Sequence, residues 1–101
     1  MKVNQYYTTG MNDILRQEYE VPPIEFNEIA VKSVYTGVCS SDVAMYRGEF
    51  PLLPTNMHGH ESLGKVLEVG SGIFNVEVGD YVATRGEPAF AERYNAPQGT
   101  F

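Results

Sequence analysis

The chain has 101 residues, of which 43% are hydrophobic and 20% are charged, and its formal net charge is −6 at pH 7. This length and composition predict one globular domain with a single modest core and argue against a disordered or fibrous chain. Seven Lys and Arg residues supply too little positive charge for a nucleic-acid site, which gains most of its affinity by neutralising phosphates.

The cysteine count and the lengths of the apolar runs indicate the cellular compartment in which the protein is expected. A single cysteine, Cys39, leaves no intramolecular disulfide, and this favours a reducing compartment. The first ten residues, MKVNQYYTTG, contain no apolar core of a signal peptide. No apolar run approaches the ~20 residues that cross a bilayer. We therefore expect a soluble cytoplasmic protein with neither a membrane nor a nucleic acid as partner.

The N-terminal third predicts one firm strand. After a tyrosine-bearing segment and a turn at Gly10, the stretch 14–20 (ILRQEYE) leaves strand and short helix open. The prolines at 22–23 end that element, because proline lacks an amide donor and restricts its neighbour. The stretch 28–38 is rich in β-branched residues, and it predicts a strand that ends at Gly37.

The remaining residues predict one short helix and further strands. Residues 40–48 begin with serines, carry an acid in the first turn and close on a glycine, as a short helix does. A proline-containing loop is expected over 49–57, and strands are expected over 64–70, 76–84 and 89–96. Short strands with Gly and Pro turns and one or two short helices predict a mainly β fold, a small β-barrel or sandwich.

Cys39 is the first candidate for chemistry. A lone cysteine often serves as a small buried apolar residue. Cys39 also lies directly before the predicted helix, where the helix N-terminus lowers a thiol pKa and favours the thiolate that attacks or binds metal. The structural and the chemical interpretation both remain open on this residue alone.

Both histidines lie in the nonapeptide NMHGHESLG, residues 56–64. His60 and Glu61 could form a structural hydrogen-bonded pair, or they could join Cys39 in a set of thiolate, imidazole and carboxylate that zinc accepts. The protease motif H-E-x-x-H is absent, since position 64 is glycine. A Cys39 nucleophile with His60 as its base is another alternative. No glycine cluster adjoins Cys39 to form its oxyanion hole.

Two nucleotide-binding motifs are incomplete or absent. The stretch GSGIFN, residues 70–75, begins like G-x-G-x-x-G but ends in Asn75, and no helix is predicted after it. The sequence also lacks G-x-x-x-x-G-K-[ST]. We therefore predict no dinucleotide site within these 101 residues.

A set of motifs occurs in a characteristic order along the chain. They are GVCSSD at 37–42, GHESLG at 59–64, VLEVGSG at 66–72, VGDYV at 78–82 and AFAE at 89–92. Together they closely resemble the N-terminal part of the zinc-dependent medium-chain alcohol dehydrogenase family, over residues 24–97. The resemblance implies a GroES-like β-barrel, which agrees with the strand pattern, and a single GroES-like domain over residues 1–101.

The resemblance also implies roles for individual residues. Cys39 and His60 match the positions that bind catalytic zinc, and Glu61 matches an acid that is a third ligand or a close neighbour of the metal. Ser41 matches the hydroxyl that relays the substrate proton, and Asp42 the acid that orients a ligating histidine. The implied reaction is the zinc-dependent oxidation of an alcohol or polyol, with hydride transfer to NAD(P). Ser41 and Asp42 also suit simple helix capping.

Three features depart from the family pattern. His58 has no counterpart in it, and we expect this residue on a surface loop. The turn RGEP, residues 85–88, stands where a cysteine-rich lobe carries structural zinc, so no structural zinc is expected. No Rossmann nucleotide-binding domain follows, so NAD(P) would require a further domain or a partner subunit, and the chain alone is expected to be inactive.

Two interpretations of the whole chain follow. In the first, it is the catalytic-domain portion of a zinc-dependent dehydrogenase that a Rossmann domain completes. In the second, it is a free-standing GroES-like barrel that binds a metal or a partner without catalysis. In either case, the face that a Rossmann domain would cover is expected to leave an apolar patch and to favour homo-oligomers, as large exposed patches do.

Overall fold

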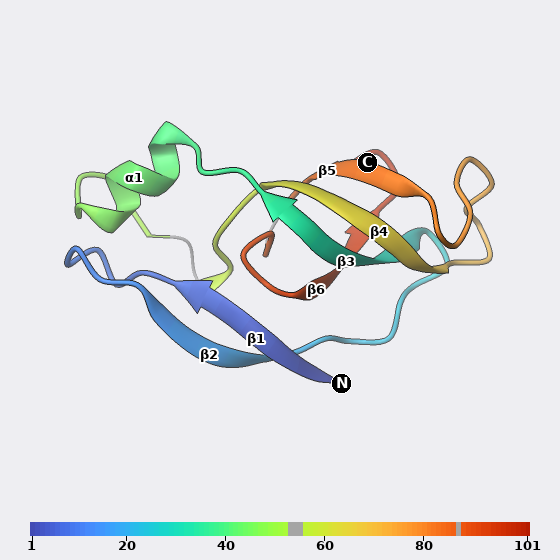
Figure 1. Cartoon of the computed structure of the whole chain (residues 1–101), viewed down its shortest axis with the longest axis horizontal. Helices are drawn as coiled ribbons and strands as arrows, with labels where there is room; N and C mark the ends of the chain where they lie inside the picture. Colours follow the sequence, from blue (N-terminus) through green and yellow to red (C-terminus); the bar gives the residue numbers. More distant parts are fainter. Residues whose placement is uncertain (53–55, 87) are drawn as a thin grey trace.

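The strands form two antiparallel sheets, and one short helix lies beside the turn of the smaller sheet (Figure 1). The computed structural model describes residues 1–52, 56–86 and 88–101. Its elements are β1 (Lys2–Tyr7), β2 (Leu15–Glu20), β3 (Glu28–Thr36), α1 (Ser40–Tyr46), β4 (Glu61–Val69), β5 (Tyr81–Arg85) and β6 (Arg93–Pro97). The prediction of a mainly β chain with a short helix is confirmed.

The first sheet is the hairpin of β1 and β2. Lys2 lies opposite Glu20 and Tyr7 opposite Leu15, in unbroken register. This pairing makes the stretch 14–20, open between strand and helix from its sequence, a strand from residue 15 onward. Between the strands, Asp13 Oδ1 accepts hydrogen bonds from the Thr8 hydroxyl and from the Thr9 N–H. The hairpin therefore depends on a partner strand and on the chemistry of its turn.

The second sheet has the strand order β5-β4-β3-β6, and it carries the core. Side chains on β4 and β5 alternate between buried and exposed, so one face of each strand is covered. Thr84 Oγ1 and Tyr94 Oη lie 2.5 Å apart within this core, so two buried hydroxyls satisfy each other. The buried cluster consists of Ile29, Val31, Val66, Ile73, Val82, Tyr94 and Ala96.

Several predicted boundaries shift in the structure. The strand expected over 64–70 begins at Glu61, and the strand expected over 89–96 becomes β6 at 93–97. Ala91 instead forms an isolated bridge with Gln5, which links the two sheets. Pro97 ends β6 without disrupting it, because β6 is an edge strand. The described pairing gives two sheets, so closure into a barrel remains a prediction.

Parts of two predicted turns lie outside the described residues. These are residues 53–55 of the loop expected over 49–57, and Glu87 of the turn expected over 85–88. Within the described part of the chain, no helix has the length and apolar character needed to span a membrane.

Gly64 on β4 offers a test of the sheet packing. A Cβ there would lie 2.2 Å from Val31 Cγ1 and 2.7 Å from the Lys32 carbonyl oxygen. Because this backbone contact cannot move aside cheaply, we expect Gly64→Ala to destabilise the fold by about 1 to 3 kcal/mol. At Gly37, a Cβ would meet only the Glu61 side chain, at 3.2 Å. Thermal unfolding should show a much larger loss for Gly64→Ala than for Gly37→Ala, and equal losses would contradict this packing.

Candidate metal centre

Cys39 lies at the junction between β3 and α1. The Gly37 N–H donates to the Glu61 carbonyl oxygen at 2.9 Å, which ties the end of β3 to the start of β4. Cys39 itself is extended, with φ −89° and ψ 161°, and its N–H donates to Asp42 Oδ2 at 2.8 Å. The side chain of an acid at the third position of a helix often accepts a hydrogen bond from the backbone N–H of the residue that precedes the helix. This local bond fixes the backbone from which the Cys39 thiol projects.

His60 is held by the backbone on the other side of the site. The Ala89 N–H donates to the Gly59 carbonyl at 2.9 Å, and the Gly86 N–H donates to the His60 carbonyl at 3.1 Å. Gly59 has φ +86°, and a Cβ there would lie 2.7 Å from the Phe90 ring. Only glycine meets both conditions without strain. The backbone therefore bends at Gly59 and presents His60 toward Cys39.

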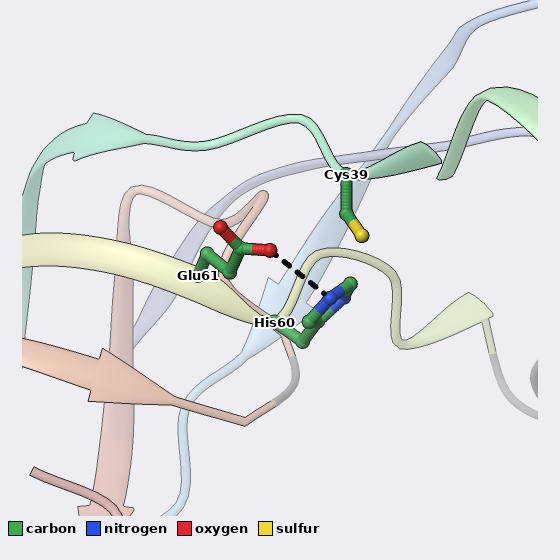
Figure 2. Close-up of side chains that lie close together, drawn as sticks. All are labelled: Cys39, His60 and Glu61. Carbon is green, nitrogen blue, oxygen red and sulfur yellow. Dashed lines mark ion pairs between the residues drawn. The ribbon is translucent and has the colours of Figure 1, made fainter. Parts of the chain in front are cut away.

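The structure brings the predicted donor residues together, as Figure 2 shows. One ligand atom each from Cys39, His60 and Glu61 lies within 4.8 Å of the others. His60 Nε2 and Glu61 Oε2 are 3.4 Å apart, which is longer than a good hydrogen bond. Among the described residues, these three side chains form the one group of His, Cys, Asp or Glu residues that lie close enough together to hold a metal ion.

The donor set fits zinc. Thiolate, imidazole and carboxylate are all zinc ligands, and catalytic zinc sites keep three protein ligands and one open position. With bonds of 2.0 to 2.3 Å, two ligands of a tetrahedral zinc site lie about 3.5 Å apart. The His60–Glu61 separation is close to this spacing, and the full cluster needs only a small closure of side chains that are all at least partly exposed.

Asp42 lies behind His60 in the protein interior. Its side chain is 5% exposed, and its Oδ1 is 3.8 Å from His60 Nδ1. Oδ1 has no hydrogen-bond partner among the described residues, whereas Oδ2 accepts the Cys39 N–H. The carboxylate therefore faces the ring nitrogen remote from Glu61, at a distance that a small ring rotation would close.

The thiol and the imidazole shift each other's protonation. The Ser41 backbone N–H, the Ser41 hydroxyl and His60 all lower the pKa of Cys39. The Cys39 side chain, followed by the charge of Asp42, raises the pKa of His60 against the opposing effect of burial. Ser41 and His60 together therefore favour the Cys39 thiolate that metal binding requires.

This electrostatic arrangement predicts a reactive thiol in the metal-free protein. The rate of Cys39 alkylation by iodoacetamide should rise with pH around a midpoint below that of the same thiol in the urea-unfolded chain, because only the thiolate reacts. Ser41→Ala should move the midpoint part of the way back. Identical midpoints for the folded and the unfolded chain would show that Ser41 and His60 do not stabilise the thiolate.

The prediction for His58 is wrong: this residue is buried and does not lie on a surface loop. It is 2% exposed, its Nδ1 accepts the Thr8 N–H at 3.2 Å, and its ring meets Tyr7 edge-on at a centroid distance of 6.4 Å. Burial lowers the pKa of His58. The bend at Gly59 turns the two histidines into different environments. Nothing in the local sequence signals this burial, because it depends on the β1–β2 hairpin.

Sequence reasoning also missed Arg85. β5 pairs with β4 so that Arg85 lies directly opposite Glu61, and a groove lined by His60, Glu61, Arg85 and Gly86 opens beside the cluster. A cationic side chain therefore borders the candidate centre. The strand register alone brings it there, and the sequence carries no motif that marks it.

Comparison with known families agrees with this geometry. Residues 25–99 match the family described as "Alcohol dehydrogenase GroES-like domain". The chain belongs to this family. The GroES-like domain thus covers most of the sequence, including every residue of the candidate metal centre.

Individual relatives of this GroES-like domain are dehydrogenases and reductases by name. It is 37% identical over 90 residues to D-xylulose reductase of Scheffersomyces stipitis, covering 84% of this chain and 24% of that protein. It is 36% identical over 84 residues to zinc-type alcohol dehydrogenase B of Aspergillus flavus, covering 82% and 20%. The chain spans about a quarter or less of the length of the curated relatives it matches.

Solved structures share the fold. A cinnamyl alcohol dehydrogenase of Sorghum bicolor superposes with a TM-score of 0.81 at 14% identity, over 99% of this chain and 40% of that one. For 2R,3R-butanediol dehydrogenase of Bacillus subtilis, the TM-score is 0.79 at 21% identity, over 99% and 39%. The GroES-like architecture therefore extends over nearly the whole chain, including the hairpin that precedes residue 25.

Proposed function

We propose that this GroES-like domain supplies the zinc donors of a zinc-dependent alcohol or polyol dehydrogenase. The observation that supports this most is the convergence of Cys39, His60 and Glu61 within 4.8 Å. These residues come from two segments about twenty positions apart, and a fold without a metal site has no need to bring a thiol, an imidazole and a carboxylate together. The family and the names of the relatives point to the same chemistry.

Cys39, His60 and Glu61 would hold the zinc ion, with the Cys39 thiolate as the soft donor. Zinc supplies Lewis acidity that makes an alcohol easier to deprotonate. His60 Nε2 faces Glu61 and is therefore the nitrogen placed to ligate. Nδ1 then carries the proton and can donate it in a hydrogen bond to Asp42 Oδ1, which would fix the orientation of the ring.

Ser41 has the role of a proton carrier in this proposal. Ser41 lies in the first turn of α1, two residues after Cys39, and its hydroxyl lowers the pKa of the Cys39 thiol, so it would border an alcohol bound beside the donors. A hydroxyl both donates and accepts, so Ser41 Oγ could take a proton from an alcohol while it releases its own proton to solvent water, since Ser41 is only partly buried. The Ser41 hydroxyl would also favour the thiolate form of Cys39, because it lowers the pKa of that thiol.

The nucleotide cofactor and the partner of the domain also belong to the proposal. NAD(P) would be held by a Rossmann domain or a partner subunit that packs beside the donors. The outer surface next to Glu61 includes exposed apolar side chains: Tyr35 is 72% exposed and Leu63, its neighbour across the sheet, is 39% exposed. Tyr81 on β5 is also exposed, opposite the charged Lys65 of β4. We assign the contact with the Rossmann domain or partner subunit to this face. In a chain without such a partner, the same face would favour self-association.

A chimeric enzyme tests the proposed function. Residues 25–99 would replace the homologous segment of the D-xylulose reductase of Scheffersomyces stipitis. The chimera should reduce D-xylulose, and Cys39→Ser should lower that activity by more than about 100-fold, since loss of a ligand exceeds the effect of losing a residue that only supports one.

Two glutamates on β4 provide a matched control. Glu61→Gln should lower the activity of the chimera, whereas Glu68→Gln, on the same strand and equally exposed, should not. A folded, zinc-loaded chimera without activity would contradict the catalytic proposal and would favour a domain that binds metal without catalysis. Full activity in Cys39→Ser would remove Cys39 from the site.

A further inference from the structure

Two lysines lie directly opposite each other on the outer face of the larger sheet. Lys32 of β3 is paired with Lys65 of β4, and both side chains are exposed. The adjacent pair, Val31 and Val66, belongs to the core, so the lysines point the opposite way, to solvent. Side chains at opposed positions begin about 4.5 to 5.5 Å apart, so the sheet holds two positive charges beside each other.

The described acids near this pair are engaged elsewhere. Neither lysine forms an ion pair with a described residue. Of the glutamates of β4, Glu61 faces His60 at 3.4 Å and Glu68 pairs with Arg93. The carboxylate of Asp80, just before β5, accepts a backbone N–H of its own turn at 2.9 Å. Like charges directly opposite each other destabilise a sheet, so a carboxylate from outside would remove a cost that the fold bears here.

Exposed aromatic and aliphatic side chains surround the two lysines. Tyr81 of β5 lies opposite Lys65 and is 64% exposed. The exposed pair of Tyr35 and Leu63 lies between the lysines and the donor cluster, on strands that run side by side (Figure 1). We call Lys32, Tyr35, Leu63, Lys65 and Tyr81 the lysine face. Aromatic side chains beside charged ones are typical of surfaces that bind other proteins.

We propose that the lysine face docks the acidic surface of a partner protein, with a carboxylate between Lys32 and Lys65 and with the tyrosines and Leu63 packed around it. The face is basic on a chain whose net charge is −6, and charge complementarity of this kind selects partners and orients them. The proposal rests on the partner contact proposed above for this face, and it adds the charge that the partner presents. It requires no zinc, because neither lysine belongs to the donor cluster.

Three probes test the proposal on the metal-free 101-residue chain: a hexaglutamate peptide, a hexalysine peptide and a hexanucleotide of single-stranded DNA. In about 0.05 M salt, hexaglutamate should cause saturable amide shifts centred on Lys32, Tyr35, Lys65 and Tyr81. These shifts should disappear at about 1 M salt, where charges are screened within about 3 Å. Hexalysine should cause no shifts at the lysine face. Tighter binding of the DNA than of hexaglutamate would assign the face to nucleic acid and overturn the proposal.

Charge reversal at one lysine separates docking from folding. Lys65→Glu places an acid opposite Lys32, so it should raise the midpoint of thermal unfolding by roughly 2 to 6 °C. It should also weaken hexaglutamate binding at least about fivefold, because it removes one lysine and occupies the other. Lys32→Glu is the reciprocal variant and should have the same two effects. Arg47→Glu, at the end of α1, makes the same change in net charge and should keep peptide affinity within about twofold.

Three results would overturn the proposal. The first is equal peptide affinity in Lys65→Glu and Arg47→Glu, and the second is a lowered unfolding midpoint in both lysine variants. The third is a dimer of the unaltered chain, with Lys32 and Lys65 at its interface, that excess hexaglutamate does not dissociate, since a second copy would then be the occupant. Zinc affinity should stay within a few-fold in Lys65→Glu, so a failure of docking and a failure of the metal centre are measured separately.

Discussion

Replacing His60 with alanine is expected to lower zinc affinity by more than about 100-fold, because it removes a ligand, and losing a residue that only supports a ligand already costs 10- to 100-fold. The variant keeps only two of the three donors of the cluster, the Cys39 thiolate and the Glu61 carboxylate. Competition with a chromophoric chelator would measure the affinity of the 101-residue chain for zinc at neutral pH.

His58 provides the matched control, since it is the other imidazole of the sequence. The His58 ring hydrogen-bonds the hairpin at Thr8 and is no part of the donor cluster. The variant His58→Phe should therefore keep zinc affinity within a few-fold of the unaltered chain, provided that circular dichroism shows it folded. If both variants bind zinc as tightly as the unaltered chain, the metal is held elsewhere. If His58→Phe alone loses zinc, the two histidines have been assigned the wrong way round.

Substitution of Asp42 should separate its two roles. Asp42→Ala removes the acceptor for the Cys39 N–H, and we expect it to lose about 0.5 to 2 kcal/mol of stability, as other caps do. It should also weaken zinc binding 10- to 100-fold, because the His60 ring loses the carboxylate beside its Nδ1. Asp42→Asn keeps an oxygen for Cys39 but not the charge, so it should restore most of the stability and little of the zinc affinity.

Asp80 supplies the control for the helix-capping role. Asp80 Oδ2 accepts the Glu77 N–H at 2.9 Å, the same three-residue arrangement as Asp42 and Cys39, but it lies away from the site. Asp80→Asn should leave zinc affinity unchanged. Thermal unfolding of the metal-free protein and zinc competition together give the two readouts. Equal zinc affinity for Asp42→Asn and the unaltered chain would reduce Asp42 to a helix cap.

Local patterns in the sequence were sufficient to predict most of the fold. The β-branched run of β3, the serine- and glycine-bounded α1 and the alternation of β4 each carry their own signal. The stretch 14–20 does not, because its strand state comes from pairing with β1. Similarly, the last strand begins at Arg93, since Ala91 pairs with the hairpin through a bridge that no local pattern reveals.

The candidate site likewise has residues that the sequence predicted and residues that only the structure revealed. Cys39, His60 and Glu61 were found because their residue types and their motifs stand out in the sequence, and the structure places them together. The burial of His58 and the position of Arg85 opposite Glu61 follow from contacts between distant segments. The opposed lysines of β3 and β4 are a further product of strand register, so only the structure could show them.

Zinc K-edge X-ray absorption of the zinc-loaded 101-residue chain tests the central assignment most directly. Cys39 is the sole cysteine, so any sulfur bound to zinc identifies it. We predict one sulfur at about 2.3 Å, together with nitrogen and oxygen donors at about 2.0 to 2.2 Å that include the multiple-scattering signature of one imidazole. A shell of nitrogen and oxygen alone, or one without imidazole, would contradict a zinc site built from Cys39, His60 and Glu61.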